Sequence, residues 1–167
     1  MEEKSLSNKL VTAHLGNQAQ TEWWAQQLAL LAMPGDILAL MGPMGAGKTV
    51  FASAFINALA EERGVNKFLV TSPTYNLVQI YELPGIEIYH VDLYRLEDGE
   101  DLHELGLEEA YDHGISLIEW PDRMGNSIPV DCLYVKLDQG HESTERTVSF
   151  HGQTNWFDRL QSIKHES

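Results

Sequence analysis

The segment from Gly42 to Thr49 reads Gly-Pro-Met-Gly-Ala-Gly-Lys-Thr, which is a complete G-x-x-x-x-G-K-[ST] phosphate-binding loop. Glycines in such a loop let the backbone curl until its N–H groups point at phosphate oxygens. Lys48 can then reach the β- and γ-phosphates of a nucleoside triphosphate, and the hydroxyl of Thr49 can ligate Mg²⁺. The pattern therefore predicts a site for a nucleotide such as ATP with Mg²⁺. It does not indicate on which substrate the protein acts.

The residues around this loop have the patterns that the motif requires. The apolar run 37–41 predicts a buried strand that enters the loop, and the run 49–62 predicts a helix that leaves it. The N-terminal end of that helix adds a partial positive charge at the place where phosphate would bind. The residues expected to contact the nucleotide are Gly42, Gly45, Ala46, Gly47, Lys48, Thr49 and Val50.

Chemistry on a bound triphosphate also needs carboxylates at the C-terminal ends of neighbouring strands. Asp92 follows the predicted strand 86–91, and Glu119 closes the predicted strand 115–119. Apolar residues that end in an acid are typical of Walker B segments, where the acid reaches Mg²⁺ or orients the attacking water. Either acid alone could be an ordinary surface residue, but the pair downstream of a phosphate loop favours a site. The predicted catalytic residues are Lys48, Asp92 and Glu119, and the predicted metal ligands are Thr49, Asp92 and Glu119.

Three nearby features leave alternatives open. Residues 72–75, Ser-Pro-Thr-Tyr, could form a plain turn or a switch-like loop that senses the γ-phosphate. Trp120 could pack in the core or lie over the nucleotide site. His90 could donate to a phosphate, position Asp92, or be a histidine of the core, and the sequence favours none of these interpretations.

The elements that must position these residues alternate between strand and helix patterns. Asn17 is the predicted N-cap of a first helix, with Gln20 in the capping-box position. Pro84-Gly85 separates two β-patterned runs and predicts a hairpin. The other expected elements are strands at 9–15, 77–83, 86–91, 132–137 and 147–150, a helical segment at 97–112, and a closing helix at 154–163 capped by Thr154 or Asn155.

This order of elements predicts an α/β fold in a single domain over residues 1–167, with the motifs between about residues 10 and 150. A phosphate loop after an early strand indicates a P-loop NTPase-like three-layer sandwich around a mostly parallel central sheet. The hairpin indicates that the sheet is mixed.

Composition limits the classes of partner. The chain of 167 residues has a net charge of −14, which opposes unaided binding to DNA or RNA. The segment 97–112 carries eight carboxylates and no Lys or Arg, so it is either a solvated helical face or a docking surface for a basic partner. No apolar stretch approaches the length of a membrane span, and the N-terminus lacks a secretory pattern. Cys132 opens an apolar run and is expected to be a core thiol. We therefore expect a cytoplasmic protein.

Five motifs in this order resemble the TsaE (formerly YjeE) family, small bacterial ATPases of tRNA threonylcarbamoyladenosine biosynthesis. They extend along nearly the whole chain. The motifs are Gly-x-x-Gly-Ala-Gly-Lys-Thr at 42–49, Ser-Pro-Thr-Tyr at 72–75, His-Val-Asp-Leu-Tyr-Arg at 90–95, Leu-Gly at 105–106 and Ile-Glu-Trp at 118–120. The main departure is Pro43-Met44, where the family usually has an acidic residue and Leu. This change bears on the hydrolysis rate and on partner contacts.

The resemblance implies roles for particular residues. Thr49 and Glu119 would ligate Mg²⁺, and Asp92 would act beside them in a second switch-like segment. The first switch-like loop would be 72–75, which includes Thr74. Trp120 would lie near the nucleotide, and Gln18 and Arg146 would border the adenine.

The resemblance also implies partners. The TsaD–TsaB pair transfers the threonylcarbamoyl group to tRNA, and TsaE binds that pair and supports its turnover through an ATP cycle. A protein of this charge would then meet tRNA only indirectly, through the complex. Slow ATP hydrolysis by the isolated chain is expected, because Arg95 is the only arginine inside a motif.

Two other functions compete with this interpretation. A small-molecule phosphotransferase, or kinase, would usually close an arginine-rich lid over the phosphates, and the chain has no cluster of arginines. A GTPase would usually carry Asn-Lys-x-Asp after a strand. The pairs Asn8-Lys9 and Asn66-Lys67 both lack that Asp.

Overall fold

The computed structural model describes residues 8–97 and 102–163, and the strands in this part of the chain form a seven-stranded sheet in the order β1-β7-β6-β2-β5-β4-β3. The strands are β1 (Lys9–Leu15), β2 (Ile37–Met41), β3 (Val78–Leu83), β4 (Ile86–Asp92), β5 (Ile115–Glu119), β6 (Leu133–Gln139) and β7 (Arg146–His151). The four central strands β6, β2, β5 and β4 are parallel, while β3, β7 and β1 each pair in antiparallel fashion. The prediction of a mixed sheet with a parallel centre is confirmed.

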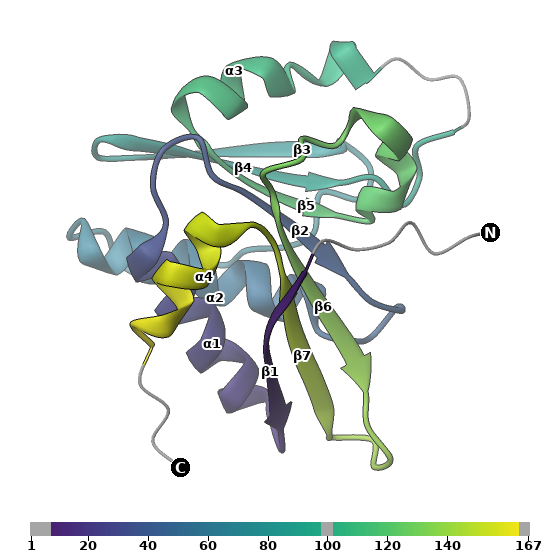
Figure 1. Cartoon of the computed structure of the whole chain (residues 1–167). Helices are drawn as coiled ribbons and strands as arrows, with labels where there is room; N and C mark the ends of the chain where they lie inside the picture. Colours follow the sequence, from purple (N-terminus) through teal and green to yellow (C-terminus); the bar gives the residue numbers. More distant parts are fainter. Residues whose placement is uncertain (1–7, 98–101, 164–167) are drawn as a thin grey trace.

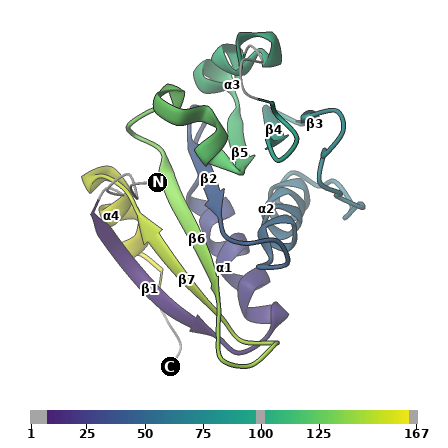
Figure 2. The ribbon, with the colours of Figure 1, turned by 90° about the vertical axis from the view of Figure 1, so that its right-hand side faces the viewer.

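Helices cover both faces of this sheet. The helices are α1 (Gln18–Leu31), α2 (Lys48–Glu62), α3 (Leu107–His113) and α4 (Thr154–Gln161), with short 3₁₀ helices η1 (Leu102–Leu105) and η2 (Pro121–Ser127). In Figure 1, α3 lies above strands β3 and β4 and α2 lies below them. The view turned by 90° in Figure 2 keeps this order. The predicted three-layer α/β sandwich is therefore confirmed.

Each face of the sheet has its own apolar core. On one face, aromatic side chains of α1, α2 and α4 pack together with those of the sheet, among them Trp24, Phe55, Phe150 and Trp156. On the other face, α3 and η2 cover residues such as Ile118. The strands between the layers are apolar on both faces, as expected for buried parallel strands. Burial on both sides holds the central strands, and with them the strand ends, in fixed positions.

The elements around the phosphate loop form where the sequence patterns predict them. β2 and β5 have the predicted bounds, and β3 and β4 form the predicted hairpin around Pro84-Gly85, with Leu83 opposite Ile86. Asn17 caps α1, because its side chain accepts a hydrogen bond from the amide of Gln20 at 3.1 Å. The Gln20 side chain itself bonds the amide of Gly16 rather than that of Asn17.

Several local predictions need correction. The expected helical segment at 97–112 forms as two short helices, η1 and α3, separated by Gly106 at φ 67°, and the expectation for residues 98–101 lies outside the described residues. The N-cap of α4 is Gln153, not Thr154 or Asn155, and it makes no side-chain capping bond. η2 was not predicted. The thiol of Cys132 is buried, as expected.

Candidate functional site

The phosphate loop connects β2 to α2 through three glycines with positive φ. Gly42 at φ 146° lies against the β6 strand, where an added Cβ would overlap the carbonyl oxygen of Leu137. Gly47 at φ 105° is the left-handed N-cap of α2. Only glycine adopts these conformations without strain, so the loop backbone can curl directly into the start of the helix. The loop therefore leads directly into the first turn of α2, and the N–H groups of that turn face out of the end of the helix.

Lys48 extends back over this loop. Its Nζ donates to the carbonyl oxygens of Gly42 at 2.5 Å and of Pro43 at 2.9 Å. It also lies 4.1 Å from the ring centroid of Trp120, within the range of a cation–π contact. Burial lowers the pKa of Lys48, while the carboxylates of Glu119 and Asp92 act in the opposite direction. An ammonium group in this partly desolvated position gains from any anion that approaches the loop.

Trp120 is neither wholly buried nor free of strain. It follows β5 with φ 59° and ψ 51°, a left-handed conformation that is uncommon for a residue with a side chain. Its ring contacts that of Tyr94, with 5.1 Å between centroids. The strained backbone turns the ring towards Lys48, so Trp120 lies at the site rather than in the core alone.

The two predicted acids lie side by side at the ends of neighbouring strands. Asp92 of β4 is opposite Glu119 of β5, and Glu119 is opposite Leu40 of β2, the strand that enters the phosphate loop. Oε1 of Glu119 lies 3.1 Å from Oγ1 of Thr49. Both carboxylates are almost fully buried. Strand register thus brings the predicted Walker B acid to the predicted metal-binding hydroxyl.

Hydroxyl groups of the 72–75 segment connect the acids. Oγ of Ser72 bonds Oδ2 of Asp92 and lies 3.2 Å from Oε2 of Glu119, and Oγ1 of Thr74 lies 3.3 Å from the same Asp92 oxygen. A serine hydroxyl has one proton to donate, so it cannot satisfy two carboxylates at once. The segment therefore belongs to the site, and Ser72 can donate to only one of the two acids at a time.

The donor set around Thr49 fits Mg²⁺. Hydroxyl and carboxylate oxygens are the hard ligands that Mg²⁺ prefers, and it commonly takes one or two carboxylates and completes its shell with phosphate and water. Thr49 and Glu119 supply such a pair, and the hydroxyl of Ser72 links Asp92 to Glu119. Within residues 8–97 and 102–163 there is no group of three or more His, Cys, Asp and Glu arranged as a metal cage. The protein alone thus offers a partial coordination shell that phosphate oxygens would complete.

His90 lies on β4 and faces Glu119. It is fully buried, and its Nε2 is 2.7 Å from Oε2 of Glu119. A phosphate, Asp92 or a place in the core were all open for His90 from its sequence position, and in the structure it is buried with Glu119 as its partner. No sequence pattern indicates this pairing, because it depends on the register between β4 and β5.

Most of the predicted site residues line one cavity of about 460 Å³ at the mouth of the phosphate loop. The predicted residues in its wall are Gly45, Gly47, Lys48, Thr49, Val50, Thr74, Asp92, Glu119 and Trp120. The wall also includes Ser72, Tyr94 and Arg95, which were not predicted as site residues, although all three lie within the motifs at 72–75 and 90–95. Gly42 and Ala46 support the loop from behind this wall.

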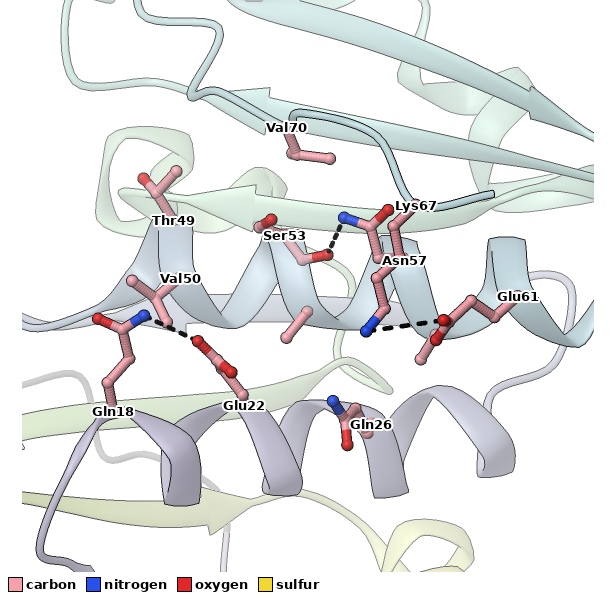
Figure 3. Close-up of a pocket in the computed structure, with 12 residues that line it drawn as sticks. Gln18, Glu22, Gln26, Thr49, Val50, Ser53, Asn57, Glu61, Lys67 and Val70 are labelled. Carbon is pink, nitrogen blue, oxygen red and sulfur yellow. Dashed lines mark hydrogen bonds and ion pairs between the residues drawn. The ribbon is translucent and has the colours of Figure 1, made fainter. Parts of the chain in front are cut away.

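A second cavity of about 350 Å³ adjoins the first at Thr49 and Val50. Figure 3 shows that it lies between α1 and α2, with Gln18 and Glu22 on one side and Val50 on the other. Gln18 donates to Glu22 at 2.8 Å. The wall of this second cavity carries both polar and apolar side chains. Its position next to the phosphate loop is suitable for the base of a nucleotide.

Arg146 at the start of β7 reaches the phosphate loop. Its guanidinium donates to the carbonyl oxygen of Gly45 at 3.1 Å and to those of Ser143 and Glu145. It lines neither cavity among the described residues. Arg146 therefore contacts the loop backbone, and it pairs with Leu15 of β1, the strand that precedes Gln18 and α1.

Comparison with known proteins agrees with the motifs. A family model described as "Threonylcarbamoyl adenosine biosynthesis protein TsaE" matches residues 15–148. Two similar proteins are named tRNA threonylcarbamoyladenosine biosynthesis protein TsaE. One is from Rickettsia prowazekii (36% identical over 146 residues, 87% of this chain and 98% of the relative), and the other is from Bacillus subtilis (33% over 145 residues, 86% and 87%). A crystal structure of Bacillus subtilis YdiB matches with a TM-score of 0.72 and 26% identity over 95% of both chains.

No helix of the described residues has the length and apolar character needed to cross a membrane.

Proposed function

Because this chain belongs to the TsaE family of threonylcarbamoyl adenosine biosynthesis proteins, we propose that it is a Mg²⁺-dependent ATPase serving the threonylcarbamoyladenosine modification of tRNA. The family takes part in the biosynthesis of that tRNA modification.

One observation carries the proposal: a phosphate loop, a lysine and a hydroxyl–carboxylate pair converge at the C-terminal ends of β2 and β5. Thr49 and Glu119 lie 3.1 Å apart beside the cavity into which Lys48 extends. Loop amides and an ammonium group bind the phosphates of a nucleotide, and the oxygen pair binds its metal. Other uses of a glycine-rich turn would not need the carboxylate at this place.

The chain's own residues would divide the work as follows. Lys48 and the loop amides neutralise phosphate charge, Thr49 and Glu119 hold Mg²⁺, and Asp92 supports the metal site or orients the attacking water. When bound, Mg²⁺ neutralises charge on the phosphate oxygens. The base would occupy the cavity between α1 and α2, next to Val50.

Hydrolysis by the isolated chain should be slow. The cavity at the loop includes a single arginine, Arg95, whose guanidinium lies over the ring of Tyr75 at 4.5 Å. An arginine that reaches the transferred phosphoryl group typically accounts for about 10³–10⁵-fold in rate. Without one directed at the phosphates, fast turnover would depend on a partner.

We propose that the partners are TsaD-like and TsaB-like proteins, which would contact the tRNA. The net charge of −14 agrees with a protein that meets tRNA only indirectly. Exposed aromatic and apolar side chains surround the mouth of the site, with Tyr75 and Met44 at 82% and 66% exposure. Apolar side chains of this kind are typical of interface cores.

The proposal is tested with purified chain by calorimetry with MgATP and by the rate of phosphate release, alone and with TsaD-like and TsaB-like proteins. We expect binding, slow release by the chain alone and faster release in the mixture. Absence of MgATP binding would contradict the proposal. Transfer of the γ-phosphate to a metabolite instead of water would favour the phosphotransferase, and binding of GTP without ATP would favour a GTPase.

A further inference from the structure

His90 is buried completely, and one edge of its ring contacts the acid that we place at the metal. Nε2 lies 2.7 Å from Oε2 of Glu119, and neither side chain is appreciably exposed. His90 is opposite Leu117 of β5, and Glu119 follows two positions later on that strand, so the parallel register brings the two side chains together. Burial of such a polar side chain is costly unless its hydrogen bonds are made.

The other ring nitrogen fixes the tautomer. Nδ1 of His90 is buried and has no hydrogen-bond partner among the described residues. If Nδ1 carried the only proton, a donor would be buried without an acceptor, and the lone pair of Nε2 would face a carboxylate oxygen. The proton is therefore on Nε2, which donates to Glu119.

This hydrogen bond gives the two oxygens of the Glu119 carboxylate different partners. Oε2 of Glu119 accepts from His90 and also lies near Ser72, while Oε1 is left facing Thr49 at 3.1 Å. Without the imidazole, rotation about the last bond of the glutamate would exchange the two oxygens or turn both away from Thr49. The buried ring of His90, held on β4, prevents that rotation.

We propose that His90 is a positioning residue that holds Glu119 with one oxygen directed at the Mg²⁺ position next to Thr49. His90 itself contacts neither the metal nor the nucleotide. The role is similar to that of hydrogen-bonding groups behind metal ligands in general, whose loss typically costs about 10–100-fold in metal affinity. This inference rests on the function proposed above.

The test compares His90→Leu, His90→Gln and a control, His151→Gln. Glutamine can place an amide N–H near the position of Nε2, whereas leucine cannot donate. His151 is another buried histidine of the same sheet, on β7, whose Nε2 bonds Ser149 at 3.0 Å. The measurements are the Mg²⁺ concentration for half-maximal ATP hydrolysis, calorimetry of ATP binding with Mg²⁺ and with EDTA, and thermal melting.

We expect His90→Leu to raise the half-saturating Mg²⁺ concentration about 10–100-fold and to weaken MgATP binding, while binding of ATP in EDTA stays within about twofold. His90→Gln should recover part of the loss. His151→Gln should lower the melting temperature without a change in Mg²⁺ dependence. A folded His90→Leu protein with the Mg²⁺ dependence of the wild type would overturn the inference, as would a loss of ATP affinity of equal size in EDTA.

A spectroscopic measurement on the wild type covers the case in which the leucine variant does not fold. Long-range ¹H–¹⁵N spectra distinguish the two imidazole tautomers, and the His90 signals are assigned by their absence from His90→Gln. A protonated Nε2 with an unprotonated Nδ1 is expected, and the reverse pattern would refute the proposed hydrogen bond. Failure of the wild type to bind MgATP would remove the proposed function, whereas MgATP binding with unaltered variants would remove only the role of His90.

Discussion

The hydroxyl of Thr49 and the carboxylate of Glu119 lie 3.1 Å apart, although 70 positions separate them in the chain. Thr49 belongs to the first turn of α2, and Glu119 ends β5, the parallel neighbour of β2. Because the phosphate loop starts where β2 ends, parallel pairing alone places the acid beside the loop. This contact would join the two halves of the proposed metal site.

We expect Glu119→Gln to lower ATP hydrolysis by roughly 10² or more, because the amide cannot supply the negative charge that the metal needs. MgATP binding should weaken, and the melting temperature should stay near that of the wild type, since the buried carboxylate is replaced by a neutral group of the same shape. Phosphate release and thermal melting measure both effects. Glu109→Gln, an exposed change on α3, is the matched control and should leave hydrolysis unaltered. Full activity of Glu119→Gln would exclude that residue from the site.

Lys48→Met should abolish detectable ATP binding without unfolding the protein. Burial lowers the pKa of this lysine, so the charged form is less favoured here than in the unfolded chain. Methionine removes the cost of burying the charge, and it also removes the hydrogen bonds to Gly42 and Pro43. Because these two effects oppose each other, we expect the melting temperature to change by a few degrees at most. Calorimetry and melting curves provide the measurements. Lys9→Met, at an exposed lysine of β1 that lines neither cavity, should bind ATP normally.

Gly42 and Gly45 should respond differently to alanine. At Gly42 a Cβ would overlap the backbone carbonyl of Leu137, whereas at Gly45 no atom lies within 4 Å. Both have positive φ, which costs an alanine about 1–2 kcal/mol. We therefore expect Gly45→Ala to fold with a small loss of stability and Gly42→Ala to melt markedly lower and bind no ATP. Equal melting temperatures for the two variants would contradict the packing of the loop against β6.

Arg159 of α4 should contribute more to stability than any exposed ion pair. Its guanidinium makes two bonds to Asp36, at 2.5 and 2.9 Å, with both side chains at most 15% exposed. We expect Arg159→Gln to cost about 3 kcal/mol, because it leaves the Asp36 carboxylate without its counter-charge. Denaturant unfolding measures the loss. Lys67→Gln, which breaks an exposed pair with Glu61 at 3.6 Å, should cost less than about 1 kcal/mol.

The thiol of Cys132 should be unreactive in the folded protein. Burial raises its pKa to about 11 from an ordinary value of 9.0, and a hydrogen bond with Tyr134 only partly offsets this. Ellman's reagent near neutral pH should therefore react only after unfolding, with one thiol per chain. Since the folded pKa is the higher one, the stability contributed by the protonated thiol is complete below pH 9 and falls as the pH rises towards 11. Cys132→Ala should flatten that alkaline decline, and fast labelling of the native protein would refute the burial.

Patterns with strong local causes were predictable from the sequence. β2 and β5 are short apolar runs ended by a glycine and an acid, and their bounds were predicted correctly. The N-cap by Asn17 depends only on residues within one turn. The family assignment from five ordered motifs is confirmed, since the family model matches residues 15–148.

Features that depend on tertiary contacts were not predictable. The partner of His90 follows from the offset between β4 and β5, and no spacing in the sequence encodes it. η2 begins after Trp120 adopts a left-handed conformation that residue type alone disfavours. The division of the acidic segment into η1 and α3 at Gly106 was not predicted. The roles of Gln18, Arg146 and the other site residues stay predictions.

Asp92 and Glu119 also differ in the rigidity of the segments that contact them. Glu119 ends β5, which pairs with β2, the strand that enters the phosphate loop. Its distance from the loop can therefore change only if the sheet itself deforms. Ser72 and Thr74 instead come from a segment without regular structure, which is tied to α2 upstream by the paired hydrogen bonds between Asn57 and Phe68. One wall of the cavity is thus as stiff as the sheet, and the opposite wall is only as stiff as a few side-chain bonds. A protein that docks against Tyr75 would therefore move the hydroxyls around Asp92 more easily than the Glu119 oxygen that faces Thr49.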